Sequence, residues 1–188
     1  IKVAYGERLN LMQDEVKLNG WALESRIYAE DPYRNFLPST GRLTKFKPPQ
    51  VFDDEVKVIR NDCGVIEGGE INIYYDPMIS KLCSWGKTRE EAISYMQEAL
   101  DNYQIEGIGQ NIPFLHSVFR NRDFCKGNIS TAFIENNYPE GFKGEKLSEE
   151  ERNQLVALIT FVHHTKNLRD QSISGRLDVF EGNGDEEY

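Results

Sequence analysis

The spacing of apolar residues changes period once along this chain of 188 residues, close to Trp85. Before that point apolar and polar residues alternate, as they do in strands with one buried face. After it apolar residues recur every three or four positions, which is typical of amphipathic helices. Strands that come first and helices that follow, without regular βαβ alternation, predict an α+β fold with a mainly antiparallel sheet.

The predicted strands are short and are bounded by turn signals. Thr88 and Glu91 form a capping box, which predicts the start of a helix that ends near Tyr103. Asn111 is expected to cap a shorter helix, and Ser130 or Thr131 a further one that ends near residue 137. The strands are predicted at residues 21–30, 42–46, 56–60, 70–75 and 78–85, with a turn at 61–64.

A second domain is expected after a linker. Residues 138–144 contain one proline and two glycines, which indicates a connection between folded parts. Ser148 and Glu151 then form another capping box, and a long helix follows with an apolar stripe from Leu155 to Val162. We therefore expect one domain at residues 1–138, a linker at 139–147, and the start of another domain at 148–188, made of the long helix and a polar tail.

The composition excludes several classes of protein. The net charge of -9 leaves no basic face of the kind that nucleic-acid binding requires. No apolar run approaches the roughly 20 residues of a membrane span, and no signal peptide opens the chain. The sequence therefore predicts no nucleic-acid partner and no membrane association.

No metal site or disulfide framework is expected. The cysteines Cys63, Cys83 and Cys125 are widely spaced and odd in number, so we expect unpaired, buried or half-buried thiols. Two of the three histidines, His163 and His164, are adjacent on the predicted long helix and point about 100° apart, so they cannot easily share a metal.

Two polar positions are candidates for a site. Arg26 lies in the middle of a predicted strand, on the same face as Glu24 and Glu30, and periodicity alone leaves two interpretations. The face is either solvated, with cross-strand ion pairs, or turned toward a ligand or another domain. The pair Asp76–Pro77 interrupts a strand-like segment, so it marks either a simple turn or a bulge of the kind that redirects side chains near sites.

Four ordered blocks of the chain resemble the C-terminal domain of biotin carboxylases. They read WALESRIYAEDP at residues 21–32, FLPSTG at 36–41, YYDPMISKL at 74–82 and IEGIGQN at 105–111, and the region of residues 133–134 is similar too. The resemblance covers residues 1 to about 138. The stretch that follows resembles the α subunits of propionyl-CoA carboxylases, in which this helix opens the domain that docks onto the carboxyltransferase β subunit.

The resemblance implies a role for both polar positions. In biotin carboxylases, ATP and bicarbonate form carboxyphosphate, which yields carbon dioxide for attack by the ureido nitrogen of biotin. Arg26 matches the arginine that stabilises the charge developing on the ureido oxygen, a role for which a fixed, permanently charged guanidinium is suited. Asp76 matches an acidic residue beside it, which we expect to orient the guanidinium through a charge-assisted hydrogen bond.

The resemblance also implies that this chain is a piece of a longer enzyme. It begins at Ile1 rather than Met, and it lacks the ATP, Mg²⁺ and bicarbonate residues and the AMKM tetrapeptide that carries biotin. The ATP-grasp part is expected upstream and the biotin carrier downstream, so the isolated chain is expected to bind none of these cofactors and to be inactive. The expected compartment is the cytoplasm of a bacterium, or the mitochondrial matrix if the source is eukaryotic.

Two alternatives stay open. The chain could belong to another biotin-dependent acyl-CoA carboxylase, such as those acting on acetyl-CoA or 3-methylcrotonyl-CoA. It could instead act only as a docking module, because the apolar stripe of the long helix suits either a partner or its own domain.

Overall fold

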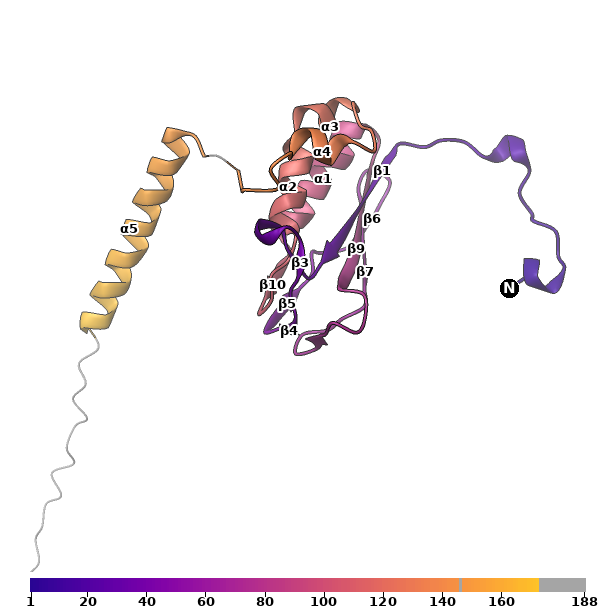
Figure 1. The fold of residues 1–188 in the computed structure, drawn as a ribbon. Helices are drawn as coiled ribbons and strands as arrows, with labels where there is room; N and C mark the ends of the chain where they lie inside the picture. Colours follow the sequence, from indigo (N-terminus) through magenta and orange to yellow (C-terminus); the bar gives the residue numbers. More distant parts are fainter. Residues whose placement is uncertain (146, 173–188) are drawn as a thin grey trace, which may run out of the picture. The chain divides into compact units, whose positions relative to one another are not determined.

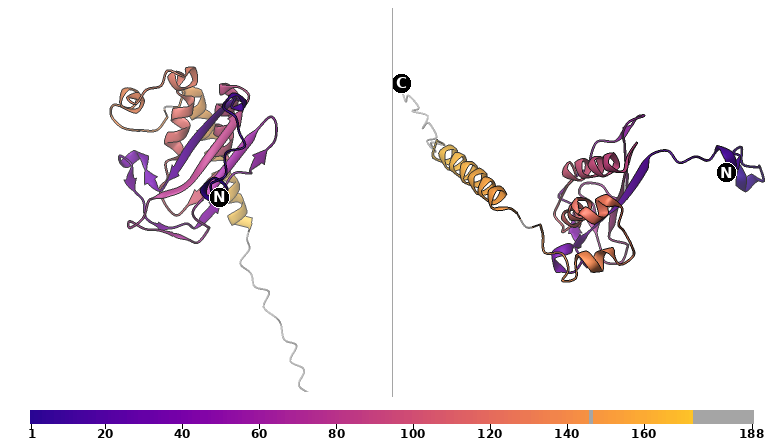
Figure 2. Two further views of the ribbon diagram at one scale, coloured as in Figure 1. Left: turned by 90° about the vertical axis from the view of Figure 1, so that its right-hand side faces the viewer. Right: turned by 90° about the horizontal axis from the view of Figure 1, so that it is seen from above.

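The computed structural model describes residues 1–145 and 147–172. The chain divides into two compact units, Ile1–Gly144 and Glu145–Tyr188, and each is described by itself. The first unit is an α+β domain in which the helices gather on one side of an antiparallel sheet (Figure 1; Figure 2, right). The predicted fold class is confirmed.

The main sheet of the first unit has four strands in the order β1-β9-β7-β6. The strands are β1 (Trp21–Tyr28), β9 (Met78–Gly86), β7 (Val58–Cys63) and β6 (Phe52–Asp53), and all neighbours are antiparallel. β1 therefore forms one edge of this sheet, and the long strand β9 is its centre (Figure 2, left).

Shorter elements surround the sheet in three further antiparallel pairs. These pairs are β2 (Glu30–Asp31) with β3 (Leu37–Pro38), β4 (Gly41–Arg42) with β8 (Glu70–Ile71), and β5 (Lys45–Lys47) with β10 (Gln104–Glu106). The 3₁₀ helices are η1 (Val3–Tyr5), η2 (Gln13–Glu15) and η3 (Pro32–Arg34). Residues 1–19, which include η1 and η2, are exposed throughout.

Helix α1 (Arg89–Asp101) covers one face of the sheet, and its first turn is the predicted capping box. The Glu91 amide donates to the Thr88 hydroxyl at 3.2 Å, and the Thr88 amide donates to the Glu91 carboxylate at 3.1 Å. The apolar side of α1 is buried at Ala92, Ile93, Met96, Ala99 and Leu100. All of these except Ala92 belong to the core, together with inner side chains of the sheet such as Ile27, Ile59 and Leu82.

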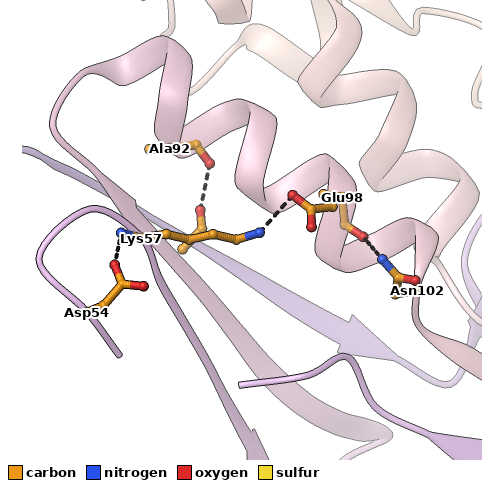
Figure 3. Close-up of polar contacts among 6 residues, drawn as sticks. Asp54, Lys57, Ala92, Glu98 and Asn102 are labelled. Atoms are coloured by element: carbon orange, nitrogen blue, oxygen red, sulfur yellow. Dashed lines mark hydrogen bonds and ion pairs between the residues drawn. The ribbon is translucent and has the colours of Figure 1, made fainter. Parts of the chain in front are cut away.

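Polar contacts also tie α1 to the sheet (Figure 3). The Ser84 hydroxyl of β9 donates to the Ala92 carbonyl at 2.7 Å. Lys57 Nζ pairs with the Glu98 carboxylate at 2.7 Å and lies 5.0 Å from the centroid of the Tyr95 ring. The face of the sheet that carries Ser84 is thus the face that α1 covers.

Three short helices complete the first unit, α2 (Ile112–Arg120), α3 (Arg122–Lys126) and α4 (Phe133–Asn137). The end of α4 is as predicted, but its N-cap is Ala132 rather than Ser130 or Thr131, and no side chain caps it. The helix α3 was not predicted. Asn121 caps α3 by accepting from the Asp123 amide at 2.8 Å, and a left-handed Gly127 (φ 78°) ends it.

Three local predictions about strands are wrong. Residues 42–46 were expected to form one strand, but β4 ends at Arg42, β5 begins at Lys45, and the two pair with different strands. Residues 61–64 were expected to turn, but β7 continues to Cys63 because Asp62 and Cys63 pair with Lys81 and Ser80 of β9. Residues 70–75 were expected to form one strand, but β8 ends at Ile71. There the Asn72 side chain accepts from the Tyr74 amide at 2.9 Å, and such turns compete with strand pairing.

Tyr103 links α1 to the sheet through a buried hydroxyl. Its oxygen lies 2.9 Å from the Ser80 hydroxyl, and burial raises the pKa of Tyr103 to about 12.

We expect Tyr103→Phe to lower the free energy of unfolding by about 1–2 kcal/mol, because the buried Ser80 hydroxyl loses its partner. Urea unfolding of the chain measures the change. Tyr95→Phe, which keeps the ring beside Lys57, is the control and should cost less than about 0.5 kcal/mol; equal losses would contradict the assignment.

In the second unit, α5 (Glu149–Ser172) begins at the predicted capping box. The Ser148 amide donates to the Glu151 carboxylate at 2.8 Å. The apolar stripe is open to solvent, with Leu155 44% and Leu158 and Ile159 each 58% exposed. Whether this stripe packs on a partner or on its own domain stays open. The division into a domain at residues 1–138, a linker at 139–147 and a further domain from residue 148 stays a prediction. Lys146 and the predicted polar tail at 173–188 lie outside the described residues.

Candidate functional site

The two faces of β1 differ in character. Ser25 and Ile27 are buried beneath α1, whereas Glu24 and Arg26 are exposed on the face of the sheet away from α1. Arg26 therefore lies on the polar face that the alternation predicted. Because side chains of directly paired residues share a face, this face continues onto β9 and β7 through the pairs Glu24 with Cys83, Arg26 with Lys81, Arg60 with Cys83, and Asp62 with Lys81.

Arg26 presents its guanidinium on this open face. Its Nε lies 3.2 Å from the Glu24 carboxylate, and the two side chains are 55% and 45% exposed. The Tyr28 hydroxyl and then the Glu24 carboxylate raise the pKa of Arg26, so the side chain stays charged. Lys81, directly across on β9, adds a second positive charge. The arrangement suits a developing negative charge above the sheet.

Asp76 lies in an exposed turn immediately before β9. Its carboxylate accepts a hydrogen bond from the Met78 amide at 2.9 Å, and the carbonyl of Pro77 accepts from the Ala29 amide at 2.8 Å. The bulge anticipated near this pair lies at Ile79, because Ile27 pairs with Ser80 while Tyr28 pairs with Met78. Asp76–Pro77 thus forms a turn, and a bulge follows it.

The expected hydrogen bond between Asp76 and Arg26 is not formed among the described residues. Arg26 is bonded to Glu24, and Asp76 acts instead on Glu30, whose pKa is raised by burial and then by the Asp76 charge. Asp76 precedes β9 and lies near Glu30, beyond the Tyr28 end of β1. Among the described residues, the groups that act on Arg26 are Tyr28 and Glu24 rather than Asp76.

An apolar groove of about 440 Å³ runs along the free edge of β1, beside Arg26. Its far wall comes from α2, α3 and α4 and includes Phe114, Phe124 and Phe133. The volume falls within the range of small-molecule sites. The guanidinium thus has a charged surface on one side and an apolar groove on the other.

Sequence reasoning missed two residues at this site, Lys81 and Asn111. The alternation of 78–85 placed Lys81 on one face of its strand, but only the pairing with β1 brings it opposite Arg26. Asn111 was expected to cap a helix, yet its side chain does not cap α2. Its side-chain amide bonds instead to the backbone of β1, at the carbonyl of Arg26 and the amide of Tyr28. Nothing local in the sequence signals a contact across so many residues.

The described residues hold no group of three or more His, Cys, Asp or Glu side chains that could bind a metal ion. No helix in the described part of the chain is long and apolar enough to cross a membrane. The three cysteines are unpaired, and Cys63 is exposed, whereas a buried or half-buried thiol was expected.

The first unit, with its antiparallel sheet and the helices that cover it, matches a known family. Residues 24–136 match the family model of the biotin carboxylase C-terminal domain, and the chain belongs to this family.

Among curated relatives, the chain is 46% identical over 196 residues to the propionyl-CoA carboxylase alpha chain of Ruegeria pomeroyi, covering 96% of this chain and 29% of the relative. It is 41% identical over 145 residues to the alpha subunit of mitochondrial methylcrotonoyl-CoA carboxylase of Arabidopsis thaliana, covering 77% of this chain and 19% of the relative. The chain thus spans less than a third of the length of these relatives.

A solved structure is similar as well. The biotin carboxylase domain of Hydrogenobacter thermophilus 2-oxoglutarate carboxylase, in complex with MgADP, ADP and bicarbonate, matches with a TM-score of 0.67 at 36% identity. The match covers 72% of this chain and 29% of that chain.

Proposed function

We propose that this chain is part of the α subunit of a propionyl-CoA carboxylase, and that the whole subunit uses ATP and bicarbonate to carboxylate biotin. Carboxylated biotin then carboxylates propionyl-CoA to methylmalonyl-CoA. The observation that carries the proposal is the charged guanidinium of Arg26 on the open face of the sheet, within a domain of the biotin carboxylase family. The longer match to a propionyl-CoA carboxylase than to a methylcrotonoyl-CoA carboxylase favours this acyl-CoA.

Arg26 fits a role toward biotin. Biotin supplies the ureido nitrogen that is carboxylated, and loss of its proton places negative charge on the neighbouring ureido oxygen. A guanidinium held on a strand, half exposed and charged at neutral pH, can donate hydrogen bonds to that oxygen. Preorganised donors of this kind stabilise the transition state more than the ground state.

Asp76 is proposed to act at the same site in a different way from the expected one. It holds the start of β9 through the Met78 amide, directly opposite the end of β1. The backbone of Tyr28 is therefore paired with a residue that Asp76 fixes. We assign Asp76 to shaping this end of the site.

The other cofactors and partners are assigned to the rest of the subunit. ATP and Mg²⁺ are proposed to bind upstream of this chain, which covers 29% of the propionyl-CoA carboxylase alpha chain of Ruegeria pomeroyi. The biotin carrier is placed downstream, and the carboxyltransferase β subunit is the proposed partner of the segment that includes α5. A bacterial cytoplasm is the proposed compartment, or the mitochondrial matrix for a eukaryotic source.

The test compares the isolated chain with the full-length subunit. We expect the full-length subunit with its β subunit to fix labelled bicarbonate into propionyl-CoA faster than into acetyl-CoA or 3-methylcrotonyl-CoA, and the isolated chain to show no ATP-dependent turnover. A preference for 3-methylcrotonyl-CoA would favour the alternative carboxylase. Turnover by the isolated chain would contradict the assignment of ATP binding to the upstream part.

The docking alternative concerns α5 alone. Its exposed stripe at Leu155, Leu158 and Ile159 favours a binding role. A pull-down of the chain with the β subunit, repeated with Leu158→Glu, would separate this role from packing within the subunit.

A further inference from the structure

Asn111 is a buried residue whose side chain is committed to the free edge of β1. It lies between β10 and α2 and is 6% exposed. Its Oδ1 accepts from the Tyr28 amide at 2.9 Å, and its Nδ2 donates to the Arg26 carbonyl at 3.1 Å. Its own amide donates to the Tyr28 carbonyl at 3.2 Å. One residue therefore makes three hydrogen bonds to the strand segment that carries Arg26.

These bonds replace a missing neighbouring strand. β1 is the edge of the main sheet, so the outward backbone groups of Arg26 and Tyr28 have no strand beside them. The side-chain amide of Asn111 matches the donor and acceptor pattern of a peptide group and pairs with these groups instead. The backbone is thereby held on both sides, by β9 on one and by Asn111 on the other.

The three hydrogen bonds of Asn111, here called the Asn111 clamp, lie where the pairing between β1 and β9 is least regular. The register with β9 shifts between Ile27 and Tyr28, and a bulge increases local twist and redirects side chains. Asn111 bonds to the residues on both sides of Ile27. The direction of the Arg26 Cα–Cβ bond depends on this backbone, so the clamp fixes the point from which the guanidinium is presented.

A capping role does not account for the side chain. Asn111 occupies the N-cap position of α2, but its side chain makes no capping bond. The Ile112 amide donates to Gln110 Oε1 at 2.6 Å instead. The polar part of Asn111 thus serves β1 and not the helix that it precedes.

We propose that Asn111 is a positioning residue for Arg26: it holds the edge of β1 so that the guanidinium stays aligned with the oxygen on which charge develops. The proposal rests on the function proposed for Arg26. Misplacement of a charge-stabilising group by about 1 Å can lower a rate by roughly 100-fold, so a backbone clamp at this point has a measurable effect.

The test is a double-mutant cycle in the full-length subunit with Arg26→Ala, Asn111→Ala and the double variant. Two rates are measured, carboxylation of free biotin and bicarbonate-dependent ATP hydrolysis without biotin. We expect Asn111→Ala to lower biotin carboxylation by about 10- to 100-fold and to leave ATP hydrolysis within about twofold. We expect no further loss when Asn111→Ala is added to Arg26→Ala, because residues that act as a unit are not additive.

Two further variants make the test robust. Asn111→Asp retains the acceptor for the Tyr28 amide but places a carboxylate oxygen where the donor to the Arg26 carbonyl was, so it should still slow biotin carboxylation, and thermal unfolding of the variant checks its fold. Asn121→Ala is the matched control. Asn121 also precedes a helix, but its side chain bonds to Asn137 at 2.9 Å and to the first turn of α3 rather than to the backbone of β1, so Asn121→Ala should carboxylate biotin at the normal rate.

Distinct results would overturn the proposal. A parallel fall in carboxylation and ATP hydrolysis would show a general structural role, and independent, multiplying losses in the double variant would show that Asn111 does not act through Arg26. A normal rate for Asn111→Asp and Asn111→Ala would also refute it while leaving the role of Arg26 intact. If Arg26→Ala itself carboxylated biotin normally, the function proposed for Arg26 would fail and this inference with it.

Discussion

Arg26→Ala in the full-length subunit is expected to lower the rate of biotin carboxylation by about 100- to 1,000-fold, the cost of removing one preorganised donor to a developing oxyanion. The fold should tolerate the change. The side chain is 55% exposed and its ion pair with Glu24 is a surface pair, which contributes little to stability. The measurement is steady-state carboxylation of free biotin, with thermal unfolding of the same preparation as a check on the fold.

Two variants decide how the effect is interpreted. Arg26→Lys keeps the charge but not the planar fork, so its rate should lie between those of the wild type and Arg26→Ala. Arg60→Ala removes another arginine from the same open face, where Arg60 is 70% exposed and pairs with Asp62, and it should carboxylate biotin normally. An equal loss in Arg60→Ala would point to the charge of the whole face, and an unchanged rate in Arg26→Ala would refute the assignment.

Gly107→Ala is expected to be the most destabilising small substitution in the first unit. Gly107 follows β10 with a φ of +101°, and a Cβ there would collide with the Arg42 carbonyl and lie 2.9 Å from the Thr44 amide. Both contacts are with backbone, so no side chain can move aside. Strain and collision together should lower the free energy of unfolding by about 3 kcal/mol or more, measured by urea unfolding of the chain.

Two other glycines separate the causes of that loss. Gly141 has a φ of +76° and open space around its Cβ position, so Gly141→Ala should cost about 1 kcal/mol from backbone strain alone. Gly64 has open space and no positive φ, so Gly64→Ala should change the stability by less than about 0.5 kcal/mol. Similar losses at all three positions would contradict the collision at Gly107.

The elements predicted correctly are those that local chemistry specifies. The strand expected at 78–85 is β9, because alternation over that length suits only an extended chain with two different faces. The helix after Thr88 is α1, because both halves of its capping box form as the spacing indicated. The same holds for Ser148 and Glu151 at the start of α5.

Two of the errors arise where a distant partner outweighs local preference. Residues 61–63 contain Asn and Asp, which favour turns, but pairing with β9 extends the strand through them. Asn111 has the residue type and position of a helix cap, but the unpaired edge of β1 offers its amide better-matched partners.

The sequence by itself determined the class of the fold, the family and the polar face on which Arg26 lies, because periodicity, capping boxes and ordered blocks are local properties. Only the tertiary structure decided what surrounds Arg26. It placed Lys81 opposite, Glu24 beside it and Asn111 against its backbone, and it kept Asp76 near Glu30 instead. These relations depend on strand register and on contacts between residues far apart in the chain, and no local pattern encodes them.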